Sequence, residues 1–285
     1  MMKHKIQFSK MHGLGNDFIV IDAITHRLEG IDLAILAKQL CNRHFGIGAD
    51  GLILVLESSK CDSKMRIFNP EGSEAEMCGN GLRCFAKFAY ENDIIEKEVF
   101  SVETLGGAMV PALILKNGKI EAIEIDMGEP AFQRSKIPML GPDTDKVINE
   151  PISINNREFR ITCVSMGNPH AVVFVEDLKT IDIPTLGPLF EKNERFPERV
   201  NTEFVQILNR QEAVTIVWER GAGETLACGT GACAVVAAGV LNNLLDRKVM
   251  VHLPGGSLPV EWQESDNHIM MSGPAELVFT GQIEI

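Results

Sequence analysis

The chain has 285 residues, of which 45% are hydrophobic and 23% charged, and its formal net charge at pH 7 is −12. This composition is typical of a globular protein, and the length suits two domains of ordinary size. The negative charge argues against a nucleic acid or an anionic membrane surface as the partner. An anionic substrate would then have to be bound by helix ends or by a specific arginine.

No segment predicts a membrane span or a secretion signal. The longest apolar stretch, at 232–241, is far shorter than the roughly 20 residues that a membrane-spanning helix needs. Polar residues such as Gln7 and Lys10 interrupt the N-terminal segment, which does not resemble a signal peptide. The seven cysteines lack the spacing of a disulfide framework, so we expect a cytoplasmic protein.

Hydrophobic periodicity predicts short strands that alternate with helices. In chain order the predicted elements are a strand at 18–21, a helix at 33–42, a strand at 51–56, a helix at 81–92, strands at 113–115, 123–125, 171–175, 204–208 and 214–218, a helix at 231–245 and a strand at 249–251. The helix at 231–245 is apolar on nearly every side and should be buried all round. In the helix at 81–92, Arg83, Lys87 and Glu91 are four residues apart, which predicts one polar stripe.

A sheet curled around a central helix satisfies both helical patterns better than a two-layer stack does. We therefore predict an α+β fold with two pseudo-symmetric domains, each a curled mixed β-sheet around a central buried helix, and an active site in the cleft between them. Glycine and proline at 127–130 predict the junction. The predicted domains are 1–128 and 129–273, with the tail at 274–285 returning to the N-terminal domain.

One short motif occurs twice, 150 residues apart. Met77-Cys78-Gly79-Asn80-Gly81 and Ala227-Cys228-Gly229-Thr230-Gly231 each place a cysteine before Gly-x-Gly and an apolar helical run. The shared order extends outward, because Gly15-Asn16-Asp17 and Gly167-Asn168-Pro169 each precede a predicted strand. A period this long indicates a domain duplication rather than a solenoid.

The repeated motif predicts a thiol at the N-terminus of a helix in each domain. Free N–H groups and the helix dipole favour anions there, and the same field is expected to lower the pKa of a thiol. Moving a proton from one face of an amino-acid α-carbon to the other needs two opposed bases, and Cys78 and Cys228 suit this task. The N–H groups of Gly79-Asn80 and Gly229-Thr230 could stabilise the charge that develops.

A lone cysteine is more often a small buried apolar residue than a reactive one. We expect this of the five cysteines without a glycine frame, which are Cys41, Cys61, Cys84, Cys163 and Cys233. A non-enzymatic zinc protein is an alternative, but the spacings Cys78-x5-Cys84 and Cys228-x4-Cys233 are looser than those of usual zinc sites.

Longer segments surround these motifs. They are KMHGLGNDF at 10–18, GSEAEMCGNG at 72–81, SMGNPH at 165–170, RVN at 199–201, ERGAGETLACGTG at 219–231, LPGG at 253–256 and SGPA at 272–275. Together they resemble the diaminopimelate epimerase family nearly from end to end. The resemblance implies an isomerase that interconverts LL- and meso-diaminopimelate in lysine and peptidoglycan precursor biosynthesis. It also implies no cofactor, neither pyridoxal phosphate nor metal, and a homodimer.

The resemblance also implies the site residues. Cys78 and Cys228 would be the acid/base residues, and His170 and Glu219 the pair that helps to move protons at the thiols. The implied substrate-binding residues are Asn16, Asn69, Gly79, Asn80, Asn168, Asn201, Glu219, Arg220, Gly229 and Thr230. A bidentate Arg220 could bind the distal carboxylate, and asparagines could distinguish the configuration of the distal centre.

The chain departs from the family pattern at two positions. Gly51 stands where some members have a glutamine at the substrate pocket, so no substrate contact is assigned there. Phe279 stands where some members have a tyrosine linked to dimer contacts.

Other interpretations remain. A proline racemase or a related two-cysteine isomerase of the same fold would bind a smaller substrate and should lack Arg220 with its asparagines. Gly-Asn pairs are usually simple turns, His170 could be a loop histidine, and Glu219 with Arg220 could form a surface ion pair.

Overall fold

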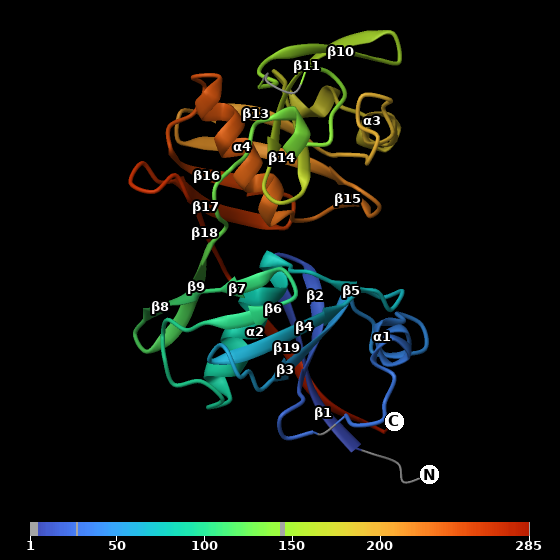
Figure 1. The fold of residues 1–285 in the computed structure, drawn as a ribbon, viewed down its shortest axis with the longest axis vertical. Helices are drawn as coiled ribbons and strands as arrows, with labels where there is room; N and C mark the ends of the chain where they lie inside the picture. The colour runs from blue at the N-terminus through green and yellow to red at the C-terminus, as the bar shows by residue number, and fades with distance from the viewer. Residues whose placement is uncertain (1–4, 27, 143–145, 285) are drawn as a thin grey trace. The chain divides into compact units, whose positions relative to one another are not determined.

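The computed structural model describes residues 5–26, 28–142 and 146–284, and the chain folds into two compact units (Figure 1). Unit 1 comprises Met1–Ile125 and Gly273–Ile285, and unit 2 comprises Asp126–Ser272. The predicted N-terminal domain begins at residue 1 and the predicted tail ends at residue 285. Residues 1–4 and 285 lie outside the described residues. Within the described residues, no helix has the length and apolar character that crossing a membrane requires.

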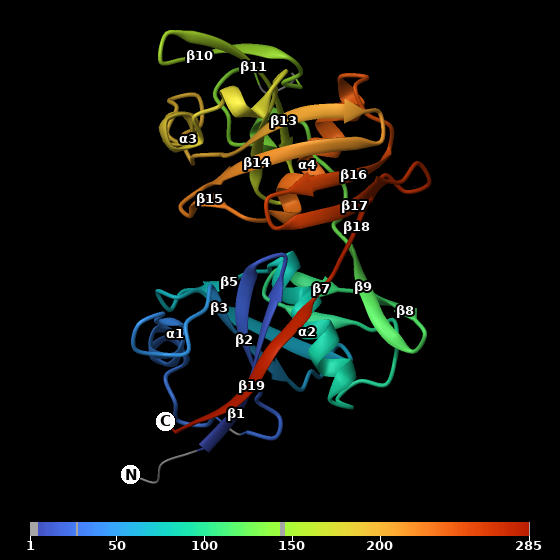
Figure 2. The same ribbon diagram turned by 180° about the vertical axis from the view of Figure 1, so that it is seen from behind.

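Unit 1 is built from one mixed sheet, a hairpin and two α-helices. Its elements are β1 (Lys5–Gly13), β2 (Asn16–Asp22), α1 (Leu33–Cys41), β3 (Gly51–Leu56), β4 (Ser63–Phe68), β5 (Glu74–Ala75), α2 (Gly79–Glu91), β6 (Val102–Thr104), β7 (Gly107–Met109), β8 (Pro111–Lys116), β9 (Lys119–Asp126) and β19 (Glu276–Glu284). The sheet order is β19-β1-β2-β3-β4-β6-β7, and β5 pairs with β4. Figure 2 shows β19 alongside β1, its antiparallel neighbour.

Unit 2 has a similar arrangement, in which each strand from β11 to β16 corresponds to the strand of unit 1 whose number is lower by ten. Its elements are η1 (Arg134–Lys136), β10 (Glu150–Ile154), β11 (Arg157–Ser165), β12 (Pro169–Phe174), η2 (Leu178–Thr180), α3 (Ile183–Glu191), β13 (Asn201–Asn209), β14 (Glu212–Glu219), β15 (Gly223–Thr225), α4 (Gly229–Leu241), β16 (Lys248–Leu253), β17 (Gly256–Trp262) and β18 (Ile269–Gly273). Its strands run in the order β10-β11-β12-β13-β14-β16-β17-β18, and β15 pairs with β14.

The two sheets have the same pattern of parallel and antiparallel neighbours. The pair β2–β3 is parallel, as is its counterpart β12–β13, and β4–β6 is parallel like β14–β16. The pairs β3–β4 and β13–β14 are both antiparallel. The predicted α+β fold of two related units with mixed sheets is therefore confirmed.

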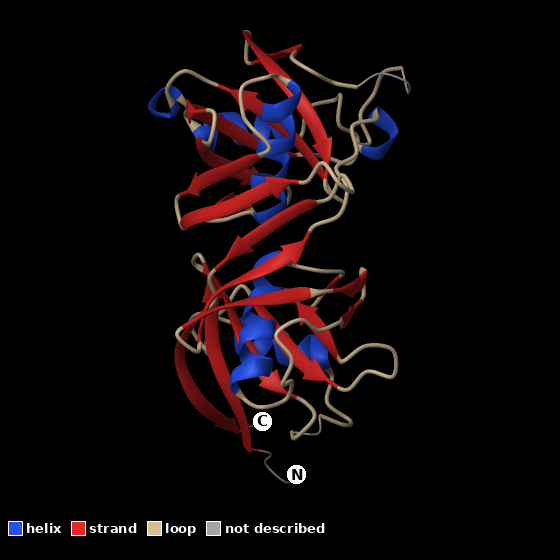
Figure 3. Ribbon diagram, turned by 90° about the vertical axis from the view of Figure 1, so that its left-hand side faces the viewer, coloured by secondary structure: helices blue, strands red, loops and turns tan. Residues whose placement is uncertain are grey.

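Each unit has one helix enclosed by strands (Figure 3). In unit 2, α4 packs against β11, β12, β13, β14, β16 and β17, and all nine residues from Gly231 to Gly239 are buried. In unit 1, α2 packs against β1, β2, β3, β4 and β8. The prediction of a central buried helix is correct in both units because an apolar helical surface is stable only when strands cover it.

The predicted polar stripe on α2 is only partly correct. Lys87 and Glu91 form an ion pair at 3.3 Å near the surface, as four-residue spacing allows. Arg83, however, is fully buried, and its Nε donates to the carbonyl oxygen of Pro274, just before β19, at 3.0 Å. The returning tail supplies an acceptor that the helical pattern alone cannot reveal.

Candidate active site

Both repeated cysteines are N-cap residues. Cys78 precedes α2 and Cys228 precedes α4, each with an extended backbone. The first intrahelical hydrogen bonds run from Leu82 N to Cys78 O at 2.8 Å and from Ala232 N to Cys228 O at 3.0 Å. The N–H groups of the Gly-x-Gly residues therefore lie in the first turn, where a helix binds anions.

The first residue of β2, Asn16, contacts both repeated-motif side chains of unit 1. Oδ1 of Asn16 lies 3.8 Å from Sγ of Cys78 and accepts a hydrogen bond from Nδ2 of Asn80 at 3.2 Å. Nδ2 of Asn16 donates to Oδ2 of Asp50 at 2.9 Å. We call Asn16, Asn69, Cys78, Gly79 and Asn80 the unit-1 half-site.

A network of charges holds the residues behind Asn16. Arg43 donates to Asp17 and to Asp50, both at 2.7 Å, and Lys10 lies 2.5 Å from Asp17. Burial opposes ionisation of Asp17, but the hydrogen bonds from Arg43 and Lys10 outweigh it and lower the pKa of Asp17 to about 2. The Asn16 segment is therefore tied to the segment that precedes β3.

Asn69 lies just after β4, and its Nδ2 donates to Oγ of Ser73 at 2.9 Å. The strand register makes Asn69 the counterpart of Glu219. Phe68 pairs with Leu52 in unit 1 as Trp218 pairs with Thr202 in unit 2, and each predicted site residue follows directly.

In unit 2 a series of close contacts ends at Cys228. Nδ1 of His170 lies 2.7 Å from Oε1 of Glu203, and Nε2 lies 3.0 Å from Oδ1 of Asn168. Nδ2 of Asn168 donates to Oγ1 of Thr230 at 3.2 Å, and Oγ1 of Thr230 lies 3.6 Å from Sγ of Cys228. Both ring nitrogens of His170 are thus engaged by neighbouring side chains.

Glu219 is the carboxylate that interacts with the thiol of Cys228. Burial raises the pKa of Glu219, whereas hydrogen bonds from Thr225 and Cys228 act in the opposite direction. Oγ1 of Thr225 donates to Oε1 of Glu219 at 2.5 Å. A carboxylate held beside a thiol in a buried position can exchange a proton with it.

The expectation that the helix N-terminus lowers the thiol pKa is wrong for Cys228. Burial raises the pKa of Cys228 well above its usual value, and the carboxylates of Glu219 and Glu203 add to the rise. The hydrogen bond from Thr230 and the N–H of Gly231 act against it but are weaker. Desolvation and the two nearby carboxylates therefore outweigh the hydrogen bonds that Cys228 receives at the start of α4.

Asn201 holds two backbone segments of unit 2 together. Its Nδ2 donates to the carbonyl of Pro169 at 2.8 Å, and its Oδ1 accepts from the N–H of Arg220 at 2.8 Å. Arg220 itself is turned outward enough for its guanidinium to donate to the carbonyl oxygen of Glu198 at 3.1 Å. We call Asn168, His170, Asn201, Glu219, Arg220, Cys228, Gly229 and Thr230 the unit-2 half-site.

A buried carboxylate also fixes the strand end that bears Glu219 and Arg220. Glu191, at the end of α3, accepts from Nε1 of Trp218 at 2.8 Å and from the N–H of Gly221 at 3.1 Å. These two contacts lie on either side of Glu219 and Arg220 and so limit the freedom of that turn.

Sequence analysis missed Asp50, Glu191 and Glu203. Glu203 is fully buried in β13. It is the single charged residue in the buried run Thr202–Val205, and a charge in such a run is the signal that could have identified it. Asp50 and Glu191 lie in segments with several other polar residues, so no comparable signal distinguishes them.

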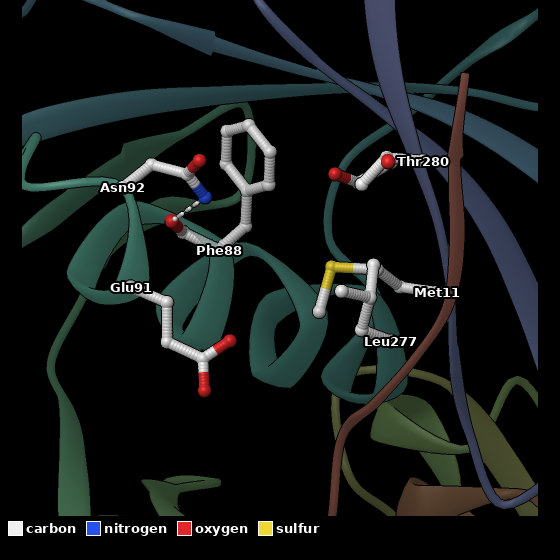
Figure 4. A pocket seen from close by; sticks show the side chains of 7 residues that line it. Met11, Phe88, Glu91, Asn92, Leu277 and Thr280 are labelled. Atoms are coloured by element: carbon white, nitrogen blue, oxygen red, sulfur yellow. Dashed lines mark hydrogen bonds between the residues drawn. The ribbon is translucent and has the colours of Figure 1, made fainter.

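Two cavities of unit 1 lie apart from the predicted residues. One of about 160 Å³ is lined by Met11, Phe88 and Leu277, among others, and contains none of the predicted site residues (Figure 4). A neighbouring groove of about 690 Å³ shares Phe88 and Thr280 with it. Across the part of the chain that the structure describes, no three His, Cys, Asp or Glu side chains converge as a metal site requires.

Solved structures define the class of fold. A *Bacillus anthracis* phenazine biosynthesis protein of the PhzF family matches with a TM-score of 0.70 at 19% identity, covering 99% of this chain and 100% of that one. A probable proline racemase from *Agrobacterium radiobacter* matches with a TM-score of 0.71 at 16% identity, covering 98% and 92%. The chain therefore has the two-domain fold that these proteins share.

Sequence comparison is more specific. The family model described as diaminopimelate epimerase matches residues 8–133 and 162–278. The diaminopimelate epimerase of *Moorella thermoacetica* is 53% identical over 280 residues, covering 98% of this chain and 100% of the relative. The chain belongs to the diaminopimelate epimerase family, and it is accordingly an isomerase.

Proposed function

We propose that this protein interconverts LL- and meso-diaminopimelate, a step in the formation of lysine and of peptidoglycan precursors, by a two-thiol acid/base mechanism. The observation that supports it most is that each unit has a cysteine as the N-cap of its enclosed helix. Identity of 53% to a diaminopimelate epimerase along nearly the whole chain supports the choice of substrate.

The chemistry requires that Cys78 and Cys228 approach one α-carbon from opposite faces. One sulfur, as thiolate, takes the α-proton, and the other, as thiol, gives its proton to the opposite face; the roles are exchanged in the reverse reaction. The N–H groups of the two helical first turns would stabilise the negative charge that spreads onto the α-carboxylate. No cofactor has to take part in these steps.

In unit 2 we assign the proton exchange with Cys228 to Glu219. Burial raises the pKa of Glu219, and the thiol of Cys228 is its hydrogen-bond partner, so a proton can pass between them. His170 contributes through its contacts with Asn168 and Glu203, because Asn168 in turn donates to the Thr230 hydroxyl that lies beside the thiol of Cys228.

The remaining residues of the two half-sites would bind the substrate. Arg220 can form a bidentate pair with the distal carboxylate once its guanidinium leaves the carbonyl of Glu198. Asn16, Asn69, Asn80 and Asn168 each offer donors and acceptors to the ammonium and carboxylate groups. This set suits a dicarboxylate better than proline, which lacks a distal charged centre.

We also propose that the protein is a cytoplasmic homodimer. Leu277, Val278 and Phe279 on the edge strand β19 are each about half exposed, at 47%, 55% and 46%, which supports an association surface there. All seven cysteines are free, and the mechanism needs two reduced thiols, which favours a reducing compartment.

The test is an assay of the purified protein with LL-diaminopimelate, with meso product measured by chiral chromatography, and with L-proline as the competing substrate. We expect turnover of diaminopimelate only, with Cys78→Ala and Cys228→Ala inactive but folded by circular dichroism. Cys61→Ala, which changes a thiol outside the helix frames, is the matched control and should be fully active. Turnover of proline, or activity in either alanine variant, would contradict the proposal.

A further inference from the structure

The two half-sites have equivalent positions but hydrogen bonds of opposite direction. Gly15 and Gly167, with φ of 86° and 88°, place Asn16 and Asn168 at matching points, at the start of β2 and directly before β12. Asn80 and Thr230 match because each is the second residue after its cysteine. Each loop asparagine is bonded to the matching helix residue, so the two bonds can be compared directly.

In unit 1 the bonds run from the helix toward the loop. Arg83, which can only donate, donates to Oδ1 of Asn80 at 2.8 Å, so Nδ2 of Asn80 faces Asn16 and donates to its Oδ1. Nδ2 of Asn16 then donates to Oδ2 of Asp50, a carboxylate that can only accept. The orientation of both amides is fixed at each end, and Oδ1 of Asn16 faces Sγ of Cys78.

In unit 2 the bonds run from the loop toward the helix. Glu203 is fully buried, its Oε1 contacts His170, and its Oε2 has no hydrogen-bond partner among the described residues. Nδ1 of His170 faces Oε1 of Glu203, which leaves Nε2 as the ring nitrogen that faces Oδ1 of Asn168 at 3.0 Å. Because this amide oxygen lies toward His170, Nδ2 of Asn168 lies toward Thr230 and donates to its Oγ1 at 3.2 Å.

The residues that set these directions are not equivalent between the units. Phe18 pairs with Gly51 as His170 pairs with Asn201, so Phe18 occupies the place of His170. Two residues further along the same strands, Ile53 occupies the place of Glu203.

The helical glycines agree with this assignment. A Cβ on Gly81 would meet Cδ1 of Ile53 at 3.2 Å, and a Cβ on Gly231 would meet Oε1 of Glu203 at 2.8 Å. Unit 1 is therefore apolar where unit 2 has its buried ionisable pair.

We propose that Asp50 and Glu203 are positioning residues that turn Asn16 and Asn168 in opposite senses, so that an amide oxygen faces Cys78 while a hydroxyl hydrogen of Thr230 is left to face Cys228. An acceptor stabilises the thiol form of Cys78, and a donor stabilises a thiolate at Cys228. The two half-sites thus differ in hydrogen bonding although the registers of their strands correspond. Only the consequence for catalysis rests on the proposed function.

Neutron diffraction from deuterium-exchanged crystals of the full chain tests the orientations without any assay. We expect the amide deuterons of Asn16 to point to Asp50, those of Asn168 to point to Thr230, and a deuteron on Nε2 of His170. Amide deuterons of Asn168 on the side of His170, or no deuteron on Nε2, would overturn the proposal. An inactive wild type with the expected deuterons would refute only the proposed function.

Paired variants test the catalytic consequence. Asp50→Ala and Glu203→Leu remove the acceptor and should lower kcat by about tenfold or more, the effect of losing a hydrogen bond to a charged group. Asp50→Asn and Glu203→Gln keep an acceptor oxygen and should recover part of that loss. The controls are Asp62→Asn, another carboxylate that accepts backbone and side-chain bonds, and the buried Thr215→Val.

The controls should keep wild-type kcat. If Asp50→Ala and Glu203→Leu were as active as the controls, the positioning role would be wrong. If Glu203→Leu does not fold, the role of Glu203 in orienting Asn168 is tested by neutron diffraction of the wild type, through the presence or absence of a deuteron on Nε2 of His170.

Discussion

The backbone N–H of Arg220 donates to Oδ1 of Asn201 at 2.8 Å, and the same side chain donates to the carbonyl of Pro169 at 2.8 Å. A single buried amide therefore links the segment of His170 to the segment of Glu219 and Arg220. Asn201→Ala should leave the buried carbonyl of Pro169 and the partly buried N–H of Arg220 without this partner and lower the free energy of unfolding by about 2–4 kcal/mol. Denaturant titration measures the change. Asn209→Ala, at the exposed end of the same strand, is the control, and equal stability of the two variants would refute the role.

Gly231 is a position on α4 where an added side chain would meet Glu203. Gly231→Ala should push Oε1 of Glu203 away from His170, because the new Cβ would lie 2.8 Å from it. We expect a loss of about 1–3 kcal/mol in stability from overpacking, with a fall in kcat. Gly81→Ala, at the matching position of α2, would meet apolar carbons, Cδ1 of Ile67 at 3.1 Å, Cδ1 of Ile53 at 3.2 Å and Cβ of Cys78 at 3.5 Å, and should cost less. The reverse ranking by thermal denaturation and steady-state kinetics would be evidence against the assigned contact.

Arg220 is the candidate anchor for the distal carboxylate. Arg220→Met should weaken productive binding by roughly 2–5 kcal/mol, because a desolvated carboxylate loses its charged partner. The measurement is KM and kcat with diaminopimelate. Arg210→Met, which removes an exposed arginine paired with Asp246, should leave both constants unchanged. An unaltered KM in Arg220→Met would exclude it as the anchor.

The thiol of Cys228 should ionise only in alkaline solution. Burial raises its pKa, and the carboxylates of Glu219 and Glu203 raise it further, so the thiolate fraction increases with pH above neutrality. Glu219→Gln removes one negative charge, which should lower the pKa of Cys228 and speed its alkylation by iodoacetamide at a fixed pH, as mapped by mass spectrometry. The exposed Glu224→Gln is the control. Slower alkylation in Glu219→Gln would show that the sign of the effect is wrong.

Much of this fold can be predicted from short segments of sequence, because strands and buried helices are specified by apolar runs within those segments. The strand at 51–56 and the burial of α4 follow from apolar runs that could be stable only inside the protein. The helix predicted at 231–245 ends earlier, at Leu241, because the backbone turns at Asn242 and its N–H caps the carbonyl groups of α4. Boundaries of this kind depend on a few capping bonds rather than on periodicity.

The electrostatics of the site could not be predicted in the same way. The helix-terminal position of Cys228 follows from its motif, but its raised pKa results first from burial and then from the carboxylates of Glu219, on β14, and Glu203, on β13. Arg83 likewise finds its acceptor at Pro274, 191 residues away in the chain. Such contacts between distant segments are set by topology and leave no periodic signal in the sequence.

The central claim is that two different thiols act on the two faces of one α-carbon. Its most direct test is to run the reaction of LL-diaminopimelate in heavy water and to measure deuterium in both product and remaining substrate at low conversion. Each thiol holds one hydrogen, so the proton taken by one cysteine can return only to the substrate, while the product receives its hydrogen from the other. We predict one solvent deuterium at an α-carbon of the meso product and none in the recovered LL substrate. Deuterium entering the remaining LL substrate as fast as the product would contradict the two-thiol account.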